Sequence, residues 1–255
     1  MDKIKENDTV ELTNGKDRFF IKIEKGKVYS THLGNINHDD IIGKEWGDTI
    51  QTHSGHNFIL IKPSLYDIIM YAIKRQTQII YPKDSGYITL KLGLRNGMKV
   101  LESGIGSGAL TIVMANALYP DGRIYAYEKE EKFLNNALKN IQLAGFENTV
   151  NAFIFDLANP LPEKNFDAAF IDVREPWLYL DNIKEALKKG APIGFLLPTT
   201  NQVIELLKGL KNHGFINIEV QELFVRDYKP IFDRFRPEDR MVAHTGYLIF
   251  AKKGF

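Results

Sequence analysis

Four acidic residues could act on one ligand, because each follows an apolar run that predicts a buried strand. They are Glu102, Glu128, Asp156 and Asp172. Ligands of an open α/β sheet bind in the crevice beyond the carboxyl ends of its strands, so these side chains are expected to surround one ligand. A group of carboxylates favours a ligand that is neutral or cationic, and it offers hydrogen-bond acceptors to hydroxyl and amino groups.

A glycine-rich loop follows the first of these strands. The sequence VLESGIGSGALT, residues 100–111, predicts a strand, a loop and the start of a helix. Its glycines let backbone amides approach a ligand at the helix N-terminus. The loop also fits the dinucleotide pattern G-x-G-x-x-A, with Glu128 placed to hold a ribose. An NAD-binding domain is therefore one alternative, and a purely structural turn is another.

The charges near this loop favour S-adenosylmethionine as the ligand. The loop carries no lysine or arginine that would neutralise a pyrophosphate. S-adenosylmethionine has a sulfonium and an ammonium group, which suit an acidic crevice. Its ribose hydroxyls would suit Glu128, and its adenine amino group would suit Asp156.

Apolar strands alternate with amphipathic helices from residue 98 onward, and these elements would position the acidic residues. The predicted strands are MKVLES, GRIYAYE, VNAFIFD, FDAAFID and APIGFLLP. Two further extended runs, NIEVQELFVRDY and TGYLIFAKK, predict a hairpin that completes the sheet. The alternation predicts an α/β domain with a mainly parallel, Rossmann-like sheet and helices on both faces.

The residues before this region have a different pattern. Residues 1–60 contain short alternating runs broken by glycines, which predict a small all-β accessory domain. Residues 61–97 are interpreted as a linking helix, with apolar residues at helical spacing from Leu65 to Ile73, and a motif that precedes the cofactor domain. Residues 98–255 form the predicted cofactor domain.

Composition narrows the possible kinds of site. The chain has no cysteine, which excludes disulfides, thiolate metal sites and cysteine nucleophiles. Its histidines lack H-E-x-x-H spacing, so no metal site is expected. No leader and no membrane-spanning apolar run is found, so we expect a cytoplasmic protein without membrane contact. A net charge of +1 means that nucleic-acid binding would need a local patch or an oligomer.

Several longer motifs make the sequence similar to a known family. They are YPKDSGYI at 81–88, VLESGIGSGALT at 100–111, YEKEEKFLNNALKN at 127–140, IDVREPW at 171–177, PTTNQV at 198–203 and RPEDRMVAHTGYLIFAKK at 236–253. In order and spacing they resemble the tRNA (adenine-N1-)-methyltransferase family of archaeal and bacterial type. The resemblance implies a class I S-adenosylmethionine-dependent methyltransferase domain with a small N-terminal β domain. It also implies methylation of N1 of an adenosine in the T-loop of tRNA, at position 58 and in archaeal members often also at position 57, by a homotetramer.

The resemblance also implies roles for individual residues. The glycine loop would hold the methionine part of the cofactor with Ser103, Gly104, Ile105, Gly106, Ser107, Gly108 and Ala109. Glu128 would hold the ribose, Phe133 would lie near the cofactor, and Asp156 would bind the adenine edge. Asp172 matches the catalytic aspartate beside the cofactor, and Tyr81 matches an aromatic residue of the pocket for the target base.

The implied reaction depends on positioning rather than on a strong base, because N1 of neutral adenine already has a free lone pair. The nucleotide must leave the folded tRNA, which costs a few kcal/mol. Stacking on Tyr81 would return about 1 to 3 kcal/mol. Asp172 would accept a hydrogen bond from the exocyclic amino group and stabilise the positive charge that develops on the ring.

Other interpretations stay open at this point. Asp172 could cap a turn at a strand end, and Tyr81 could be a core aromatic. Ile105 replaces the threonine that is usual in the family, and Arg174 stands where a proline is usual, so the loop after Asp172 is expected to be less rigid. The altered loop keeps open a methyltransferase that acts on another RNA or on a protein, and a non-catalytic RNA-binding subunit.

Two further features are interpreted as structural. His244 is expected to bond a neighbour or a subunit, because the reaction does not need it. The run from Arg226 to Arg240 mixes basic, acidic and aromatic side chains. Such a mixed surface favours a subunit contact over a phosphate track, although an oligomer could gather several copies into a groove.

Overall fold

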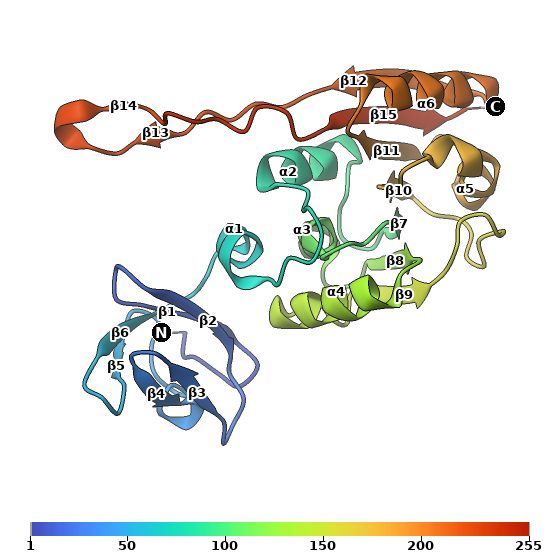
Figure 1. Cartoon of the computed structure of the whole chain (residues 1–255). Helices are drawn as coiled ribbons and strands as arrows, with labels where there is room; N and C mark the ends of the chain where they lie inside the picture. Colours follow the sequence, from blue (N-terminus) through green and yellow to red (C-terminus); the bar gives the residue numbers. More distant parts are fainter. Residues whose placement is uncertain (1, 255) are drawn as a thin grey trace. The chain divides into compact units, whose positions relative to one another are not determined.

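The computed structural model describes residues 2–254, which form two compact units (Figure 1). The first unit contains the chain up to Arg75 and the segment Leu138–Asn148, and the second contains Gln76–Ala137 and the chain from Thr149 onward. No helix within residues 2–254 is long and apolar enough to cross a membrane.

A four-stranded antiparallel sheet lies at the centre of the first unit, in the order β2-β1-β6-β5. Its strands are β1 (Thr9–Thr13), β2 (Arg18–Lys22), β5 (Thr49–Gln51) and β6 (Asn57–Ile61), and β3 (Val28–Thr31) pairs with β4 (Gly34–Asn37). Burial alternates along β6, where Phe58 and Leu60 enter the core and their neighbours face solvent. The small N-terminal β domain predicted from the sequence is confirmed.

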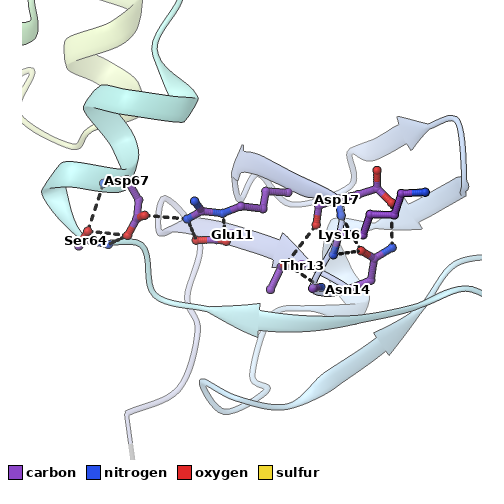
Figure 2. A network of polar contacts seen from close by, with 9 residues as sticks. Glu11, Thr13, Asn14, Lys16, Asp17, Ser64 and Asp67 are labelled. Carbon is purple, nitrogen blue, oxygen red and sulfur yellow. Dashed lines mark hydrogen bonds and ion pairs between the residues drawn. The ribbon is translucent and has the colours of Figure 1, made fainter. Parts of the chain in front are cut away.

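Arg18 links this sheet to the helical turns that follow it, and its partners Glu11 and Asp67 are labelled in Figure 2. Its guanidinium donates to both carboxylate oxygens of buried Glu11, at 2.5 and 2.8 Å, and to Oδ1 of Asp67 at 2.7 Å. Asp67 also closes a capping box with Ser64 at the start of α1 (Leu65–Asp67), which continues as a π-helical turn, Ile68–Ala72. The helical spacing from Leu65 therefore produces two short turns rather than one regular helix.

A seven-stranded mixed sheet forms the second unit, in the order β12-β15-β11-β10-β7-β8-β9. Its strands are β7 (Lys99–Ser103), β8 (Arg123–Glu128), β9 (Val150–Ile154), β10 (Ala168–Ile171), β11 (Pro192–Leu197), β12 (Phe215–Gln221) and β15 (Tyr247–Lys253). The five strands from β7 to β11 are parallel, and β15 is antiparallel to both of its neighbours. The predicted Rossmann-like class is confirmed, and so is the antiparallel pairing of the last two strands.

The order of the strands places a switch point between β7 and β10. The chain moves outward from β7 through α3 (Ala109–Leu118) and α4 (Glu131–Leu143), and then returns to β10, α5 (Leu180–Ala186) and α6 (Thr200–Asn212). Because parallel crossovers are right-handed, this reversal puts the later helices on the opposite face of the sheet. Ligands of such folds bind at the reversal.

An extended arm, residues 222–246, connects β12 to β15 and projects away from the sheet (Figure 1). Its only strand residues are β13 (Tyr228–Lys229) and β14 (Arg236–Pro237), which pair with each other across a short 3-10 turn, Phe232–Arg234. The arm exposes many apolar side chains, including Phe224, Val225, Ile231, Phe232, Phe235 and Val242.

Candidate active site

The glycine loop holds the ends of β7 and β10 close together. Gly104 has φ +85°, and a Cβ there would lie 1.9 Å from the carbonyl oxygen of Asp172. The amide of Asp172 donates to the carbonyl of Ser103 at 2.8 Å. Gly108 has φ +80° and packs on Ala137 of α4. These approaches need glycine, so the loop brings Asp172 to the N-terminal end of α3.

Glu128 ends β8 with its carboxylate fixed by backbone amides. Oε1 accepts from the amides of Lys129 at 2.8 Å and Glu130 at 3.0 Å, and Oε2 accepts from Gly106 at 3.3 Å. The carboxylate therefore has a defined orientation beside the glycine loop, and it keeps acceptor capacity for hydroxyl groups of a ligand.

Two carboxyl groups at the switch point are difficult to ionise. Burial, with the negative charge of Glu128, raises the pKa of Asp172 to about 7. Burial also raises the pKa of Glu102, which is 2% exposed, to about 8, against the effect of a hydrogen bond from Thr111 Oγ1 at 3.0 Å. Oε2 of Glu102 is buried without a hydrogen-bond partner among residues 2–254. A cation bound here would stabilise the ionised forms of both groups.

Asp156 has a different environment. Its Oδ1 accepts from the amide of Ala158 at 3.0 Å, and its Oδ2 lies 2.9 Å from Lys129 Nζ. The hydrogen bond from the amide of Ala158 and the ammonium group of Lys129 lower the pKa of Asp156. This carboxylate is therefore ionised at neutral pH and already balanced by one cation.

A cavity of about 250 Å³ opens between these strand ends. Its walls include the backbone at Ser103 and Gly104, the acidic residues Glu128 and Asp156, and three aromatic residues, Tyr127, Phe155 and Tyr179. A smaller space of about 20 Å³ lies on the other side of Gly104 and is lined by Gln78, Ile80, Glu102, Ile105 and Asp172, among others. The larger cavity can take a nucleoside, and the smaller one borders the carboxyl groups with raised pKa.

The predicted site residues divide into three groups by position. Ser103, Gly104, Glu128 and Asp156 line the larger cavity, whereas Gly104, Ile105, Gly106, Ser107, Ala109 and Asp172 line the smaller space. Gly108, Phe133 and Tyr81 line neither. Phe133 lies on α4 beneath the Nζ of Lys132, 4.6 Å from its ring centroid.

Tyr81 is the N-cap residue of α2 (Pro82–Lys91), and its hydroxyl accepts from Gln78 Nε2 at 3.2 Å. The residues directly before it, Gln78, Ile79 and Ile80, line the smaller space. Tyr81 therefore follows a wall of the site along the chain without being part of either cavity.

The sequence did not indicate the aromatic lining of the larger cavity. Tyr127 and Phe155 each stand next to a predicted acidic residue, which was the only available signal, and Tyr179 had none. Arg174 also lines this cavity, is exposed, and has its carbonyl held by Gln202 Nε2 at 2.9 Å. Within residues 2–254 no group of three or more acidic or histidine side chains is arranged to hold a metal ion.

Comparisons with known proteins agree across nearly the whole chain. The family model for the tRNA methyltransferase complex GCD14 subunit matches residues 57–234, and a TrmI-like N-terminal model matches residues 3–50. A Methanocaldococcus jannaschii protein, tRNA (adenine(57)-N(1)/adenine(58)-N(1))-methyltransferase TrmI, is 32% identical and covers 94% of this chain and 93% of its own length.

Two solved structures are similar along nearly their whole length. The tRNA (m1A58) methyltransferase TrmI from Aquifex aeolicus is 43% identical, with a TM-score of 0.78 over 98% of each chain. A Thermotoga maritima protein described as a SAM-dependent O-methyltransferase is 42% identical, with a TM-score of 0.86 over 100% of this chain and 96% of its own.

Proposed function

The chain belongs to the family of the GCD14 subunit of the tRNA methyltransferase complex, and from this premise we propose that it methylates N1 of an adenosine in tRNA. S-adenosylmethionine is the methyl donor. The target is the T-loop adenosine at position 58, with position 57 as a possible second target, as in the name of the M. jannaschii relative. The observation that carries the proposal is the group of carboxyl groups at the switch point, behind a glycine loop, where Glu102 and Glu128 are buried and Asp172 is half-buried.

The residues of the site fit S-adenosylmethionine. The sulfonium and ammonium groups of this cofactor would compensate Glu102 and Asp172, whose ionised forms are unfavourable in its absence. The backbone of the loop, Ser103–Ala109, would hold the methionine part, and Glu128 would accept hydrogen bonds from the ribose. Asp156 and the aromatic walls of the larger cavity would hold the adenine. Phe133, which lines neither space, would lie near the cofactor as the family resemblance implies. When bound, the cofactor supplies an electrophilic methyl group.

Asp172 and Tyr81 would act on the target base. Asp172 accepts a hydrogen bond from the exocyclic amino group, directs N1 toward the methyl group, and balances the positive charge that forms on the ring. Tyr81 stacks on the base after the nucleotide has left the tRNA fold. Neither role requires a proton to be removed from N1.

The description of the T. maritima protein raises a hydroxyl group as another methyl acceptor. A hydroxyl must lose its proton as it attacks, so it needs a base beside the methyl group. The pKa of Asp172, about 7, would suit such a base as well as an acceptor for an amino group. The names of the M. jannaschii and A. aeolicus relatives favour N1 of adenosine as the methyl acceptor.

The proposed assembly is a cytoplasmic homotetramer. The arm supports it, because Phe232 is 99% exposed and Phe235 and Val242 are also largely exposed. Several exposed large apolar side chains on one segment favour contact with another chain. A second copy of the chain carries the same arm, and so it offers a matching surface.

Unmodified tRNA transcripts test the proposed function directly. Purified protein is incubated with labelled S-adenosylmethionine and transcript, and the nucleosides are separated. We expect N1-methyladenosine from the normal transcript, and loss of label when adenosine 58 is replaced by uridine. Replacement of adenosine 57 shows whether that position is a second target. Absence of N1-methyladenosine, while a related enzyme methylates the same transcript, would contradict the proposal.

A further inference from the structure

Helix α2 runs along the strand from which the arm leaves the sheet. Three side chains of α2, four residues apart, bond to three positions, two residues apart, on β12 and its continuation into the arm. The bonds join Lys91 to Glu219 at 2.8 Å, Tyr87 to Gln221 at 2.9 Å, and Lys83 to the carbonyl of Leu223 at 2.9 Å. Eight helical residues advance about 12 Å and four strand residues about 13 Å, so the two rows stay in register. This match lets α2 support the strand as far as the base of the arm.

A closed polar network ends this row. Asp84 is 2% exposed, and both of its carboxylate oxygens lie 2.8 Å from Lys83 Nζ. Thr245 Oγ1, at the return end of the arm, accepts from Lys83 at 2.6 Å and donates to Asp84 at 2.8 Å. Adjacent residues of a helix do not normally face each other. Lys83 and Asp84 meet here around partners that both belong to the arm.

The arm has little backbone pairing to fix its direction. Between Gln221 and Tyr247 only four residues are in strands, and they lie near the tip. At the base, the two sides are joined by side chains. Besides the network around Thr245, His244 bonds Glu222 Oε1 at 2.6 Å and the carbonyl of Pro198 at 2.9 Å.

Tyr81 lies at the same end of α2 as this network. Its carbonyl accepts from the amides of Asp84 and Ser85, both at 2.9 Å, and Pro82 occupies the first helical position. Pro82 has a fixed φ, which limits the freedom of the joint between Tyr81 and the helix. Any displacement of Asp84 is therefore passed to Tyr81 through one helical turn.

We propose that Lys83, Asp84 and Thr245 are positioning residues that couple the arm to Tyr81. With the network closed, the base of the arm holds the first turn of α2, and this turn sets the place of Tyr81 beside the smaller space. When the network opens, the base of the arm and the first turn of α2 become mobile together. The effect on turnover rests on the proposed function, whereas the coupling itself is a property of the free protein.

Thr245 is the right residue to change, because loss of Lys83 or Asp84 would leave a buried charge unpaired and risk unfolding. Thr245→Val removes only the hydroxyl, and Thr245→Ser keeps it. Thr89→Val is the matched control, since among residues 2–254 the hydroxyl of Thr89 bonds only the carbonyl of Ser85, within α2.

Hydrogen exchange on the free full-length protein tests the coupling. In Thr245→Val we expect faster exchange both in residues 79–85 and at the arm base, with β12 and β15 unchanged. Thr245→Ser and Thr89→Val should match the wild type. Faster exchange at the arm base alone would overturn the proposal, and so would equal effects of the serine and valine variants.

Turnover provides the second measurement. Loss of the two charge-assisted bonds of the Thr245 hydroxyl predicts a kcat for tRNA methylation that is at least about tenfold lower in Thr245→Val, with cofactor affinity within about twofold of wild type. An unchanged kcat would show that Tyr81 is positioned by other means. A wild-type protein without methyl transfer would instead contradict the proposed function, and the hydrogen-exchange result would still test the coupling between the arm and Tyr81.

Discussion

At the scale of single residues, the site is defined by carboxyl groups whose environments differ. Asp156 is paired with Lys129 and stays ionised, whereas Glu102 and Asp172 are held in surroundings that disfavour their charge. Groups with such raised pKa values gather at functional sites more often than elsewhere. This difference supports the proposal that Asp156 recognises a neutral group and that Glu102 and Asp172 lie beside a cation.

Replacement of Asp172 tests its role on the target base. We expect Asp172→Ala to lower kcat by about 100- to 1000-fold, because the amino group loses its acceptor and the ring loses a balancing charge. Cofactor affinity, measured by calorimetry, should fall much less. Asp172→Asn keeps a hydrogen-bond acceptor but loses the charge, so its kcat should lie between those of the wild type and Asp172→Ala. A kcat equal to that of wild type would leave Asp172 with a structural role only.

Cofactor binding should depend on pH through Glu102 and Asp172. Both pKa values, about 8 and about 7, lie above those of an unfolded chain, so the ligand-free protein loses stability as pH rises through them. A cationic ligand favours the ionised forms. Affinity should therefore increase up to about pH 8, and binding below that pH should release protons.

Calorimetry in two buffers with different ionisation enthalpies measures this proton release. Glu102→Gln is the informative variant, because it keeps the hydrogen bond partner of Thr111 and cannot ionise. It should release fewer protons and bind the cofactor more weakly. Affinity that does not change between pH 6 and pH 8 would contradict the electrostatic role given to these groups.

The sequence predicted these residues unevenly. The glycine loop and the acidic strand ends are local patterns, in which a strand, a turn and a helix follow each other, and the structure brings them together. Tyr127 and Tyr179 were not predicted, because an aromatic that lines a cavity and one that fills a core look alike in a sequence. The sequence also could not show that Lys129 pairs with Asp156.

At the scale of elements, the glycine loop depends on close contact with the end of β10. Gly104→Ala would place a methyl group 1.9 Å from the carbonyl of Asp172, at a φ that L-residues disfavour. Gly190 has a similar φ, +74°, but open space where its Cβ would lie. The two positions separate the cost of the clash from the cost of the backbone conformation.

We expect Gly190→Ala to lower the free energy of unfolding by about 1 kcal/mol, from its backbone conformation alone. Gly104→Ala should lower it by about 3 kcal/mol or more, because neighbouring backbone must also move. Urea denaturation measures both. Equal losses of unfolding free energy in the two variants would mean that the glycine loop shifts at little cost and that the contact with Asp172 does not require glycine at position 104.

Two elements differ from the sequence-based prediction: one is shorter than predicted, and the other was not predicted. The sequence 217–228 reads as one strand, but β12 ends at Gln221, because the chain leaves the sheet there to form the arm. Helix α2 was not predicted, since Ser85 and Gly86 weaken its pattern. Its first turn depends on tertiary bonds from Lys83 and Asp84, which no local rule contains.

At the scale of the whole molecule, the arm carries several of the large apolar side chains that are exposed among residues 2–254. If a second chain covers them, as the proposed tetramer requires, the double variant Phe232→Ser and Phe235→Ser should shift the mass in solution from tetramer toward smaller species. Light scattering measures the mass, and circular dichroism checks the fold.

Ile204→Ser on α6 is the control, since Ile204 is exposed but lies outside the arm. It should leave the mass unchanged. A tetramer that persists in the double variant would show that the subunits contact each other through another surface. A wild-type monomer would contradict the proposed assembly itself.

The domain boundaries predicted from the sequence, at residues 60 and 97, stay predictions.

The place of β15 in the sheet has a consequence for synthesis of the protein. It is the last strand along the chain, yet it lies between β11 and β12, which are made earlier. While the ribosome is still translating the arm, these two strands have no common neighbour, and their unpaired edges are open to wrong partners. The sheet is completed only when Tyr247–Lys253 emerges, so a nascent chain stalled in the arm should be a target for chaperones.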